Sequence, residues 1–153
     1  MSYTLVVIDM QRSFYASRGK RVQLHCKREI QRAMDDGAAI IFVEYIGQGP
    51  TIPSLVKLTD DYRRTFFIRK ENDDGSSEVL KVIKSHRLPS RKLKFVGVNT
   101  NCCVLDTLTG VSAKSKKSSL EVISKACNSS MRYYHNEGLN IMARMKRVTV
   151  NKE

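Results

Sequence analysis

The sequence lacks any long apolar run and any histidine spacing typical of metal ligands. No stretch approaches the roughly 18 apolar residues of a membrane span, so we expect no association with a membrane. The N-terminal segment MSYTLVVIDM has no basic region before its apolar stretch, which argues against a signal peptide. The histidines, His25, His86 and His135, are widely separated. We therefore expect no metal site, and nothing in the sequence indicates a cofactor.

A CxxC pair is also missing, although the chain has four cysteines. This absence argues against a zinc ribbon and against a thioredoxin motif. Two of the cysteines, Cys102 and Cys103, are adjacent, and a disulfide between neighbours would be strained. Together with Cys26 and Cys127 they indicate free thiols in a reducing compartment. We predict a cytoplasmic location.

Acidic residues are scarce relative to basic ones: 15 against 27, for a net charge of +12. The basic residues gather at 81–94 and 112–153, whereas 35–80 is net acidic. Aromatic residues make up only 7%, and no RNA-binding or helix-turn-helix motif is present. The charge runs are typical of solvated faces, so we favour that interpretation over nucleic-acid contact or an anionic substrate, which stay open as alternatives.

Short apolar runs alternate with helical patterns along the 153 residues, which predicts one domain spanning residues 1–153. The expected strands are Tyr3–Ile8, Ala38–Tyr45, Thr65–Ile68, Leu93–Val98, Leu120–Ile123 and Arg147–Val150. The expected helices are Val22–Asp36, Ser76–Ser85, Cys102–Ala113 and Tyr134–Lys146. This alternation predicts an α/β fold with three layers, α/β/α. Its single, mostly parallel sheet should have five or six strands, with the first strand central.

Chemically capable side chains follow several of these strands. Asp9 ends the first strand, Lys70 follows the third, and Cys103 follows the fourth. In an open parallel sheet, ligands bind outside the carboxyl ends of the strands, so these side chains should converge. Each has an ordinary structural explanation when taken alone, but the combination favours a nucleophilic site. Cys103 would attack a carbonyl group, Asp9 would act as base and acid, and Lys70 would favour the thiolate.

The segments VVIDMQRSF and GVNTNCCVLDT resemble the isochorismatase-like cysteine hydrolases, which include nicotinamidases and N-carbamoyl amide hydrolases. The later ISKACNSS and HNEGLNIMARM are similar to the last strand turn and final helix of that family. The matching positions are Asp9, Gln11, Phe14, Lys70, Gly97, Thr100, Cys103 and Val104. The resemblance covers nearly the whole chain and implies a Rossmann-like sheet of the kind predicted above.

The resemblance implies an Asp9–Lys70–Cys103 triad, with Cys103 chosen because Val104 follows it. It also implies a cis peptide bond between Val98 and Asn99, and an oxyanion hole formed by the backbone N–H groups of Asn99 and Cys103. Gln11 and Phe14 become candidates for the substrate pocket. We expect the neighbouring Cys102 to point toward the core.

The chain also departs from the family. After the second strand it reads VEYIGQGPTIP, without the Asp-x-His metal motif of nicotinamidases. We therefore predict a cysteine hydrolase that cleaves an amide or carbamoyl C–N bond of a small molecule. An isochorismatase-type hydrolase of an anionic substrate and a non-catalytic binding module with a basic surface remain alternatives. The loops on the substrate side are shorter than usual for the family, which favours a homo-oligomer that completes the pocket.

Overall fold

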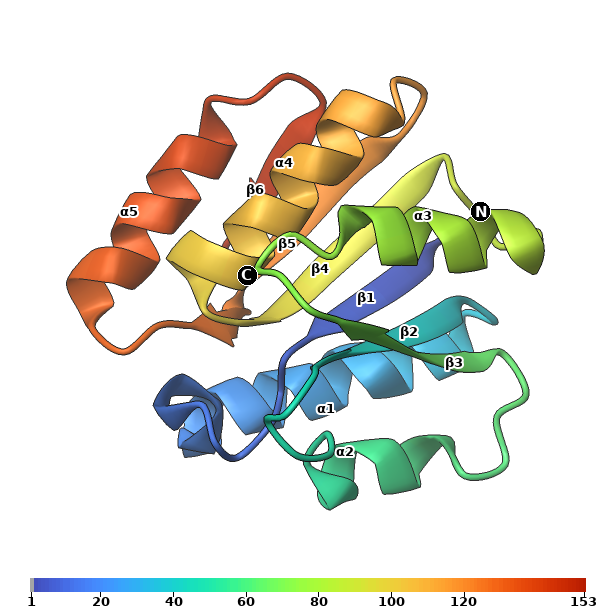
Figure 1. Cartoon of the computed structure of the whole chain (residues 1–153), viewed down its shortest axis with the longest axis horizontal. Coiled ribbons are helices and arrows are strands. Elements are labelled where there is room, and N and C mark those ends of the chain that lie inside the picture. The colour runs from blue at the N-terminus through green and yellow to red at the C-terminus, as the bar shows by residue number, and fades with distance from the viewer. Residues whose placement is uncertain (1) are drawn as a thin grey trace.

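The computed structural model describes residues 2–153 and contains one six-stranded sheet between two layers of helices (Figure 1). All neighbouring strands are parallel, in the order β3-β2-β1-β4-β5-β6. The strands are β1 (Thr4–Ile8), β2 (Ala39–Tyr45), β3 (Thr65–Lys70), β4 (Lys92–Val98), β5 (Ser119–Asn128) and β6 (Val148–Asn151). The predicted α/β fold is confirmed, and the first strand lies inside the sheet.

The helices cover both faces of the sheet (Figure 1). They are α1 (Lys20–Asp35), α2 (Pro53–Val56), α3 (Ser76–Ser85), α4 (Leu105–Lys114) and α5 (Arg132–Ala143). Apolar side chains of α1 and α2 pack in one buried cluster, and those of α3, α4 and α5 pack in a second cluster across the sheet. Because helices cover both faces, β1 has five buried residues in succession rather than an alternating pattern. None of the helices in residues 2–153 is long and apolar enough to cross a membrane.

Element boundaries differ from the sequence expectation where the apolar pattern is interrupted. Strand β5 continues to Asn128, well beyond the predicted end at Ile123. The pairing of β4 with β5 shifts register between Phe95 and Gly97, and Cys127 then pairs with Gly97. This irregularity accommodates the polar residues that seemed to end the strand. Three short helical turns were not predicted: η1 (Tyr15–Arg18), η2 (Lys57–Thr59) and α2, because single turns carry too little periodicity.

The strand order reverses direction beside β1. From β1 the chain builds outward through β2 and β3, and it then crosses back to place β4 on the other side of β1. The carboxyl ends of β1 and β4 therefore flank the topological switch point, where open α/β sheets form their ligand crevice. Asp9 directly follows β1, and the segment containing Cys103 directly follows β4.

Candidate active site

Asp9 occupies an unusual backbone conformation at the end of β1. Its φ of 53° lies in the left-handed region, which residues other than glycine adopt rarely and which costs conformational energy. Its N–H donates to the carbonyl oxygen of Val43 in β2 at 3.0 Å, which fixes the turn. The side chain is only 1% exposed. The fold thus holds a carboxylate away from water at the switch point.

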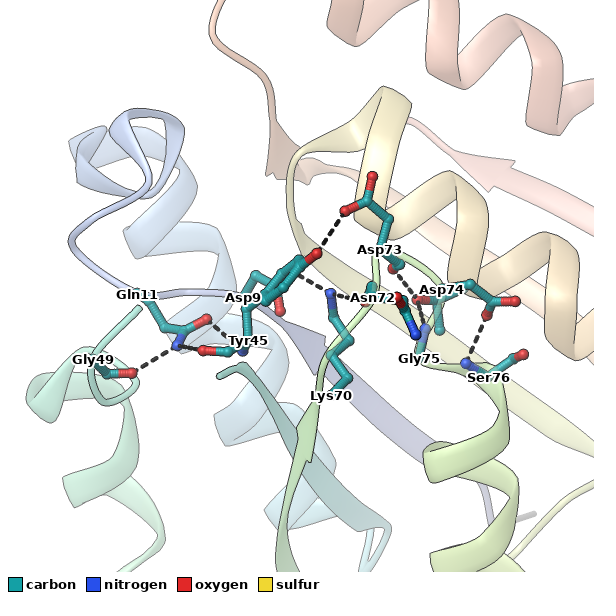
Figure 2. Close-up of polar contacts among 11 residues, drawn as sticks. Asp9, Gln11, Tyr45, Gly49, Lys70, Asn72, Asp73, Asp74, Gly75 and Ser76 are labelled. Carbon is teal, nitrogen blue, oxygen red and sulfur yellow. Dashed lines mark hydrogen bonds and ion pairs between the residues drawn. The ribbon is translucent and has the colours of Figure 1, made fainter. Parts of the chain in front are cut away.

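Lys70, the last residue of β3, brings a cation to this carboxylate. Its Nζ lies 3.1 Å from Asp9 Oδ2, donates to the carbonyl oxygen of Asn72 at 2.9 Å and sits 3.9 Å from the centre of the Tyr45 ring (Figure 2). The lysine side chain has no exposed surface. Gly75 makes room for it, since a Cβ at that position would lie 2.8 Å from Lys70 Cδ. The ammonium group is therefore fixed from several sides.

Cys103 lies in the π-helical turn η3 (Thr100–Val104), between β4 and α4. The peptide bond between Val98 and Asn99 is cis, as the family resemblance implied. Before it, Gly97 has a φ of 124°, and a Cβ there would collide with the carbonyl oxygen of Ile8. Only glycine lets β4 approach β1 so closely. This contact brings the turn that carries Cys103 to the side of Asp9.

The two adjacent cysteines are oriented differently from what we expected. Cys103 is 4% exposed and packs in the buried cluster with α4 and α5, whereas Cys102 is only partly buried. Cys102 lies near Asp73 and Asp106, which add to the effect of burial in raising its pKa. The prediction that Cys102 points toward the core is therefore wrong. Consecutive side chains on a helical turn point in different directions, so Cys103 packs in the apolar cluster while Cys102 does not.

Burial and mutual interaction shape the titration of the candidate triad. Burial raises the pKa of Asp9, while Lys70 and the Cys103 thiol oppose this shift. Burial and the Asp9 charge raise the pKa of Cys103 well above its ordinary value, against the weaker effect of Lys70. Neither Asp9 oxygen has a well-formed hydrogen bond within residues 2–153, so the thiol contact is looser than a strict hydrogen bond. Burial and the Asp9 charge therefore favour the thiol form of Cys103 over the thiolate.

Gln11 and Phe14, the two pocket candidates, lie near this site in different ways. The Gln11 amide donates to the carbonyl oxygens of Tyr45 and Gly49 at 3.0 and 2.6 Å and accepts from the Tyr45 N–H at 2.9 Å (Figure 2). Gln11 is completely buried, so in this structure it holds the loop after β2. Phe14 is partly buried and packs against the Tyr45 ring, with centroids 6.1 Å apart.

Sequence reasoning missed Tyr45 and Asp73, which complete the surroundings of Lys70. The Tyr45 hydroxyl donates to Asp73 Oδ1 at 3.1 Å, and its ring covers the Lys70 ammonium (Figure 2). Asp73 also contributes to the raised pKa values of Asp9 and Cys103, so negative charge lies close to the site. Tyr45 ends β2, and examining every strand end would have identified it. Asp73 follows β3 in a loop, where the sequence carries no comparable signal.

The sequence predicts no metal site, and the acidic, histidine and cysteine side chains of the described part of the chain are arranged as follows. Within residues 2–153, no group of three or more His, Cys, Asp or Glu side chains is arranged to hold a metal ion. Glu44, the penultimate residue of β2, accepts hydrogen bonds from the N–H and hydroxyl of Thr51, each at 2.8 Å. Asp9, Lys70 and Cys103 are therefore the chemically distinctive group at the crevice.

The chain is thus an α/β protein with a parallel sheet, and it carries a buried carboxylate, cation and thiol at the topological switch point. A model described as the Isochorismatase domain matches residues 3–153, so the chain belongs to the isochorismatase family. No curated protein matches the sequence. The family assignment agrees with the resemblance found in the sequence.

Solved structures share this fold at low sequence identity. The nicotinamidase of Staphylococcus aureus superposes with a TM-score of 0.84 at 18% identity, over 99% of this chain and 98% of that one. A zinc complex of the pyrazinamidase of Pyrococcus horikoshii gives 0.74 at 18% identity, over 99% of each chain. The MAR1 ribonuclease of Caenorhabditis elegans gives 0.81 at 18% identity, over 98% of this chain and 77% of that one. At such identities the likeness shows the fold.

Proposed function

We propose that this protein is a cysteine hydrolase that cleaves the C–N bond of a small amide or carbamoyl compound. The observation that carries the proposal is the buried contact of Asp9 with Lys70, 3.1 Å apart, beside the Cys103 thiol at the switch point. Membership of the isochorismatase family supports a hydrolase, and nicotinamidases with this fold act on an amide. Burying this carboxylate and this cation costs stability, which a functional role would explain.

In the proposed reaction, Cys103 attacks the carbonyl carbon while its proton passes to Asp9. The tetrahedral intermediate then collapses, and Asp9 returns the proton to the departing nitrogen as the C–N bond breaks. Water next attacks the thioester and gives its proton to Asp9, which passes it to the sulfur as the acid is released. The high pKa of Cys103 fits this scheme, because proton transfer accompanies attack instead of preceding it.

Lys70 and two backbone N–H groups would stabilise the charges that develop. Lys70 faces the Asp9 carboxylate and keeps its ionised form available in a buried site. The N–H groups of Asn99 and Cys103 are the proposed oxyanion hole, since both stand at the start of the helical segment that begins with η3. The first N–H groups of a helix lack intrahelical partners and can face a developing oxyanion.

Access to the sulfur requires movement of the surrounding side chains. Asp9, Lys70 and Cys103 are 1%, 0% and 4% exposed, respectively. Tyr45 covers Lys70 and is held by Asp73, so its displacement is the proposed opening step. The acidic Asp73 beside the site favours neutral or cationic substrates. It therefore argues against the isochorismatase-type alternative with an anionic substrate.

Intact-mass spectrometry after incubation with a panel of amides tests the proposal. The panel contains nicotinamide and N-carbamoyl compounds that are neutral, cationic or anionic, and adducts are mapped by peptide digestion. We expect an acyl adduct on Cys103 with a neutral or cationic member, and none in Cys103→Ala. A separate arm offers an RNA oligonucleotide, because the MAR1 ribonuclease of Caenorhabditis elegans shares the fold. Cleavage of RNA without any thiol adduct would replace this proposal by another activity.

We also propose that the protein forms a homo-oligomer. A homo-oligomer would cover exposed apolar side chains such as those of Phe67, Met131 and Tyr133. Sedimentation at increasing protein concentration tests this, and a monomer at every concentration would contradict it. The four cysteines are free, in keeping with the reducing compartment expected from the sequence.

A further inference from the structure

A basic hollow lies at the carboxyl edge of the sheet, away from the triad residues. Its volume is about 110 Å³, and its lining includes Arg21, Lys125, Arg132 and His135. A larger hollow of about 410 Å³ shares Arg21 and Lys125 with it and adds Lys152. No Asp or Glu lines either hollow. The two adjoining spaces therefore present only positive or neutral groups.

The cations of this hollow are not neutralised by the protein. Within residues 2–153, the side chains of Arg21, Lys125, Arg132 and Lys152 make no salt bridge and no hydrogen bond. By contrast, Lys70 and Lys92 each have a carboxylate partner. Four unpaired cations around one concave surface repel one another, so an anion placed among them would be stabilised.

Two helix starts add to the positive potential. Helix α1 begins after Gly19 and helix α5 after Met131, and both begin at the edge of the sheet where the strands end (Figure 1). Neither helix has an acidic residue in its first turn or a side-chain cap. Their first N–H groups therefore lack side-chain acceptors, and helix N-termini favour bound anions.

His135 provides a buried polar group directed to the hollow. The residue is 7% exposed and lines the hollow, and its Nδ1 lies 2.7 Å from Thr100 Oγ1. Its other ring nitrogen, Nε2, has no hydrogen-bond partner within residues 2–153. Burial lowers the pKa of His135, and the charges of Arg132 and Arg21 lower it further. This nitrogen keeps some accessible surface, so it can form a hydrogen bond to a ligand in the hollow.

We propose that this hollow binds the phosphate group of a small phosphorylated molecule. The phosphate occupies the smaller space between Arg21, Lys125 and Arg132, and the organic group extends into the larger space. A phosphate fits better than a carboxylate, because three convergent cations match a dianion with several acceptor oxygens. A small concave site of this kind suits a small molecule better than the backbone of a nucleic acid, which needs an extended surface.

Calorimetric titration of the full chain at fixed ionic strength tests the proposal. The probes are inorganic phosphate and adenosine 5′-monophosphate, with adenosine as the uncharged control. We expect saturable binding of both phosphates and none of adenosine. The variant R21A/R132A should weaken phosphate binding at least about ten-fold, because charge-assisted hydrogen bonds are lost. Both arginines are exposed, so the variant should fold, and circular dichroism verifies this.

The matched control removes two charges elsewhere. Lys116 and Lys117 are exposed before β5, at the opposite end of that strand from the hollow. K116A/K117A should change the affinity for phosphate less than about two-fold, since these charges are distant and screened. An equal loss in both double variants would overturn the proposal in favour of a general charge effect. Absence of saturable binding of both phosphates to the wild type would overturn it outright.

Nuclear magnetic resonance locates the bound phosphate, and a titration with an oligonucleotide distinguishes a small-molecule site from a nucleic-acid surface. Phosphate should shift the ring signals of His135 and raise its pKa, because a nearby anion favours the imidazolium. The signals of His86, which packs against Phe66 beyond this hollow, should stay in place. A single-stranded oligonucleotide that binds more tightly than either phosphate and depends equally on Arg21 and Lys116 would overturn the small-molecule proposal and indicate a nucleic-acid surface.

Discussion

The Lys70 ammonium lies 3.1 Å from the Asp9 carboxylate, and neither side chain has more than 1% of its surface exposed. Each charge depends on the other, because an unpaired buried charge is strongly unfavourable. Lys70→Met should therefore lower the free energy of unfolding by about 3–5 kcal/mol. The double variant Asp9→Asn/Lys70→Met should recover a large part of that loss in urea unfolding. Equal stability of the single and double variants would contradict the coupling.

Removal of any triad member should abolish turnover of the substrate found in the amide panel. Cys103→Ala, Asp9→Asn and Lys70→Ala should each reduce kcat by roughly 10³-fold or more, because residues that act as a unit are not additive. Cys102→Ala is the matched control and should retain kcat within a few-fold, since its thiol does not face Asp9. Steady-state kinetics on folded variants checks this. Full activity of Cys103→Ala would exclude the thioester mechanism.

Asp9→Asn should speed the alkylation of Cys103, although the same substitution should abolish turnover. The Asp9 charge raises the pKa of Cys103, whereas Lys70 lowers it. Asp9→Asn removes the larger negative charge and keeps the Lys70 cation, so the pKa of the thiol falls and more thiolate is present at neutral pH. Iodoacetamide should then label Cys103 faster, about ten-fold for each unit by which its pKa falls. Peptide mapping over time measures the rate.

Cys102 is the internal control for this experiment, because Asp73 and Asp106, but not Asp9, contribute to its pKa. Its labelling rate should be the same in the wild type and in Asp9→Asn. If labelling of Cys103 slows in the variant together with turnover, Asp9 already deprotonates the thiol in the free protein, and the proposed order of proton transfer is wrong.

The absence of a side chain at Gly75 should matter for the position of Lys70. A Cβ there would lie 2.8 Å from Lys70 Cδ, and the φ of Gly75 is −95°, which alanine adopts without strain. Gly75→Ala should therefore displace the ammonium group and lower kcat about 10²-fold with little change in KM, because small misplacements are costly in catalysis. Ser77→Ala, at an exposed position in the same first turn of α3, should leave kcat unchanged.

Glu29 in α1 should make stability depend on pH. Burial raises the pKa of Glu29 above its ordinary 4.5, and its Oε1 has no hydrogen-bond partner within residues 2–153. The folded state thus takes up this proton more readily, so stability falls as the pH rises from about 4.5 through the pKa in the folded protein. Glu29→Gln should be about 1 kcal/mol more stable than the wild type at neutral pH and equal to it in acid.

Denaturant unfolding at several pH values measures this difference. Glu29 also forms a salt bridge of 2.7 Å with Arg32, whose side chain is 56% exposed. The variant Arg32→Gln is the control for that bond, which should contribute little because it is solvated. If Glu29→Gln loses as much stability at neutral pH as Arg32→Gln does, the prediction is wrong. The attraction between Glu29 and Arg32 would then outweigh the cost of burying the Glu29 carboxylate.

The sequence by itself determined the alternation of strands and helices and the positions of Asp9, Lys70 and Cys103 at strand ends. These features are local: apolar runs indicate strands buried on both faces, and parallel strands place their carboxyl ends along one edge. Helix α3 has the predicted bounds, Ser76–Ser85, because its apolar spacing and its flanking residues agree. The family resemblance likewise depends on short contiguous motifs.

Only the tertiary structure decided which groups meet and which are buried. Cys103 instead of Cys102 packs inward because of one helical turn and the apolar cluster beneath it. The contact of Tyr45 with Asp73 joins the end of β2 to the loop after β3, and no local pattern encodes this approach. The basic hollow, too, joins Arg21 and Arg132 from opposite ends of the chain. These long-range contacts depend on strand order and on packing between distant segments, so the sequence pattern alone carries no signal for them.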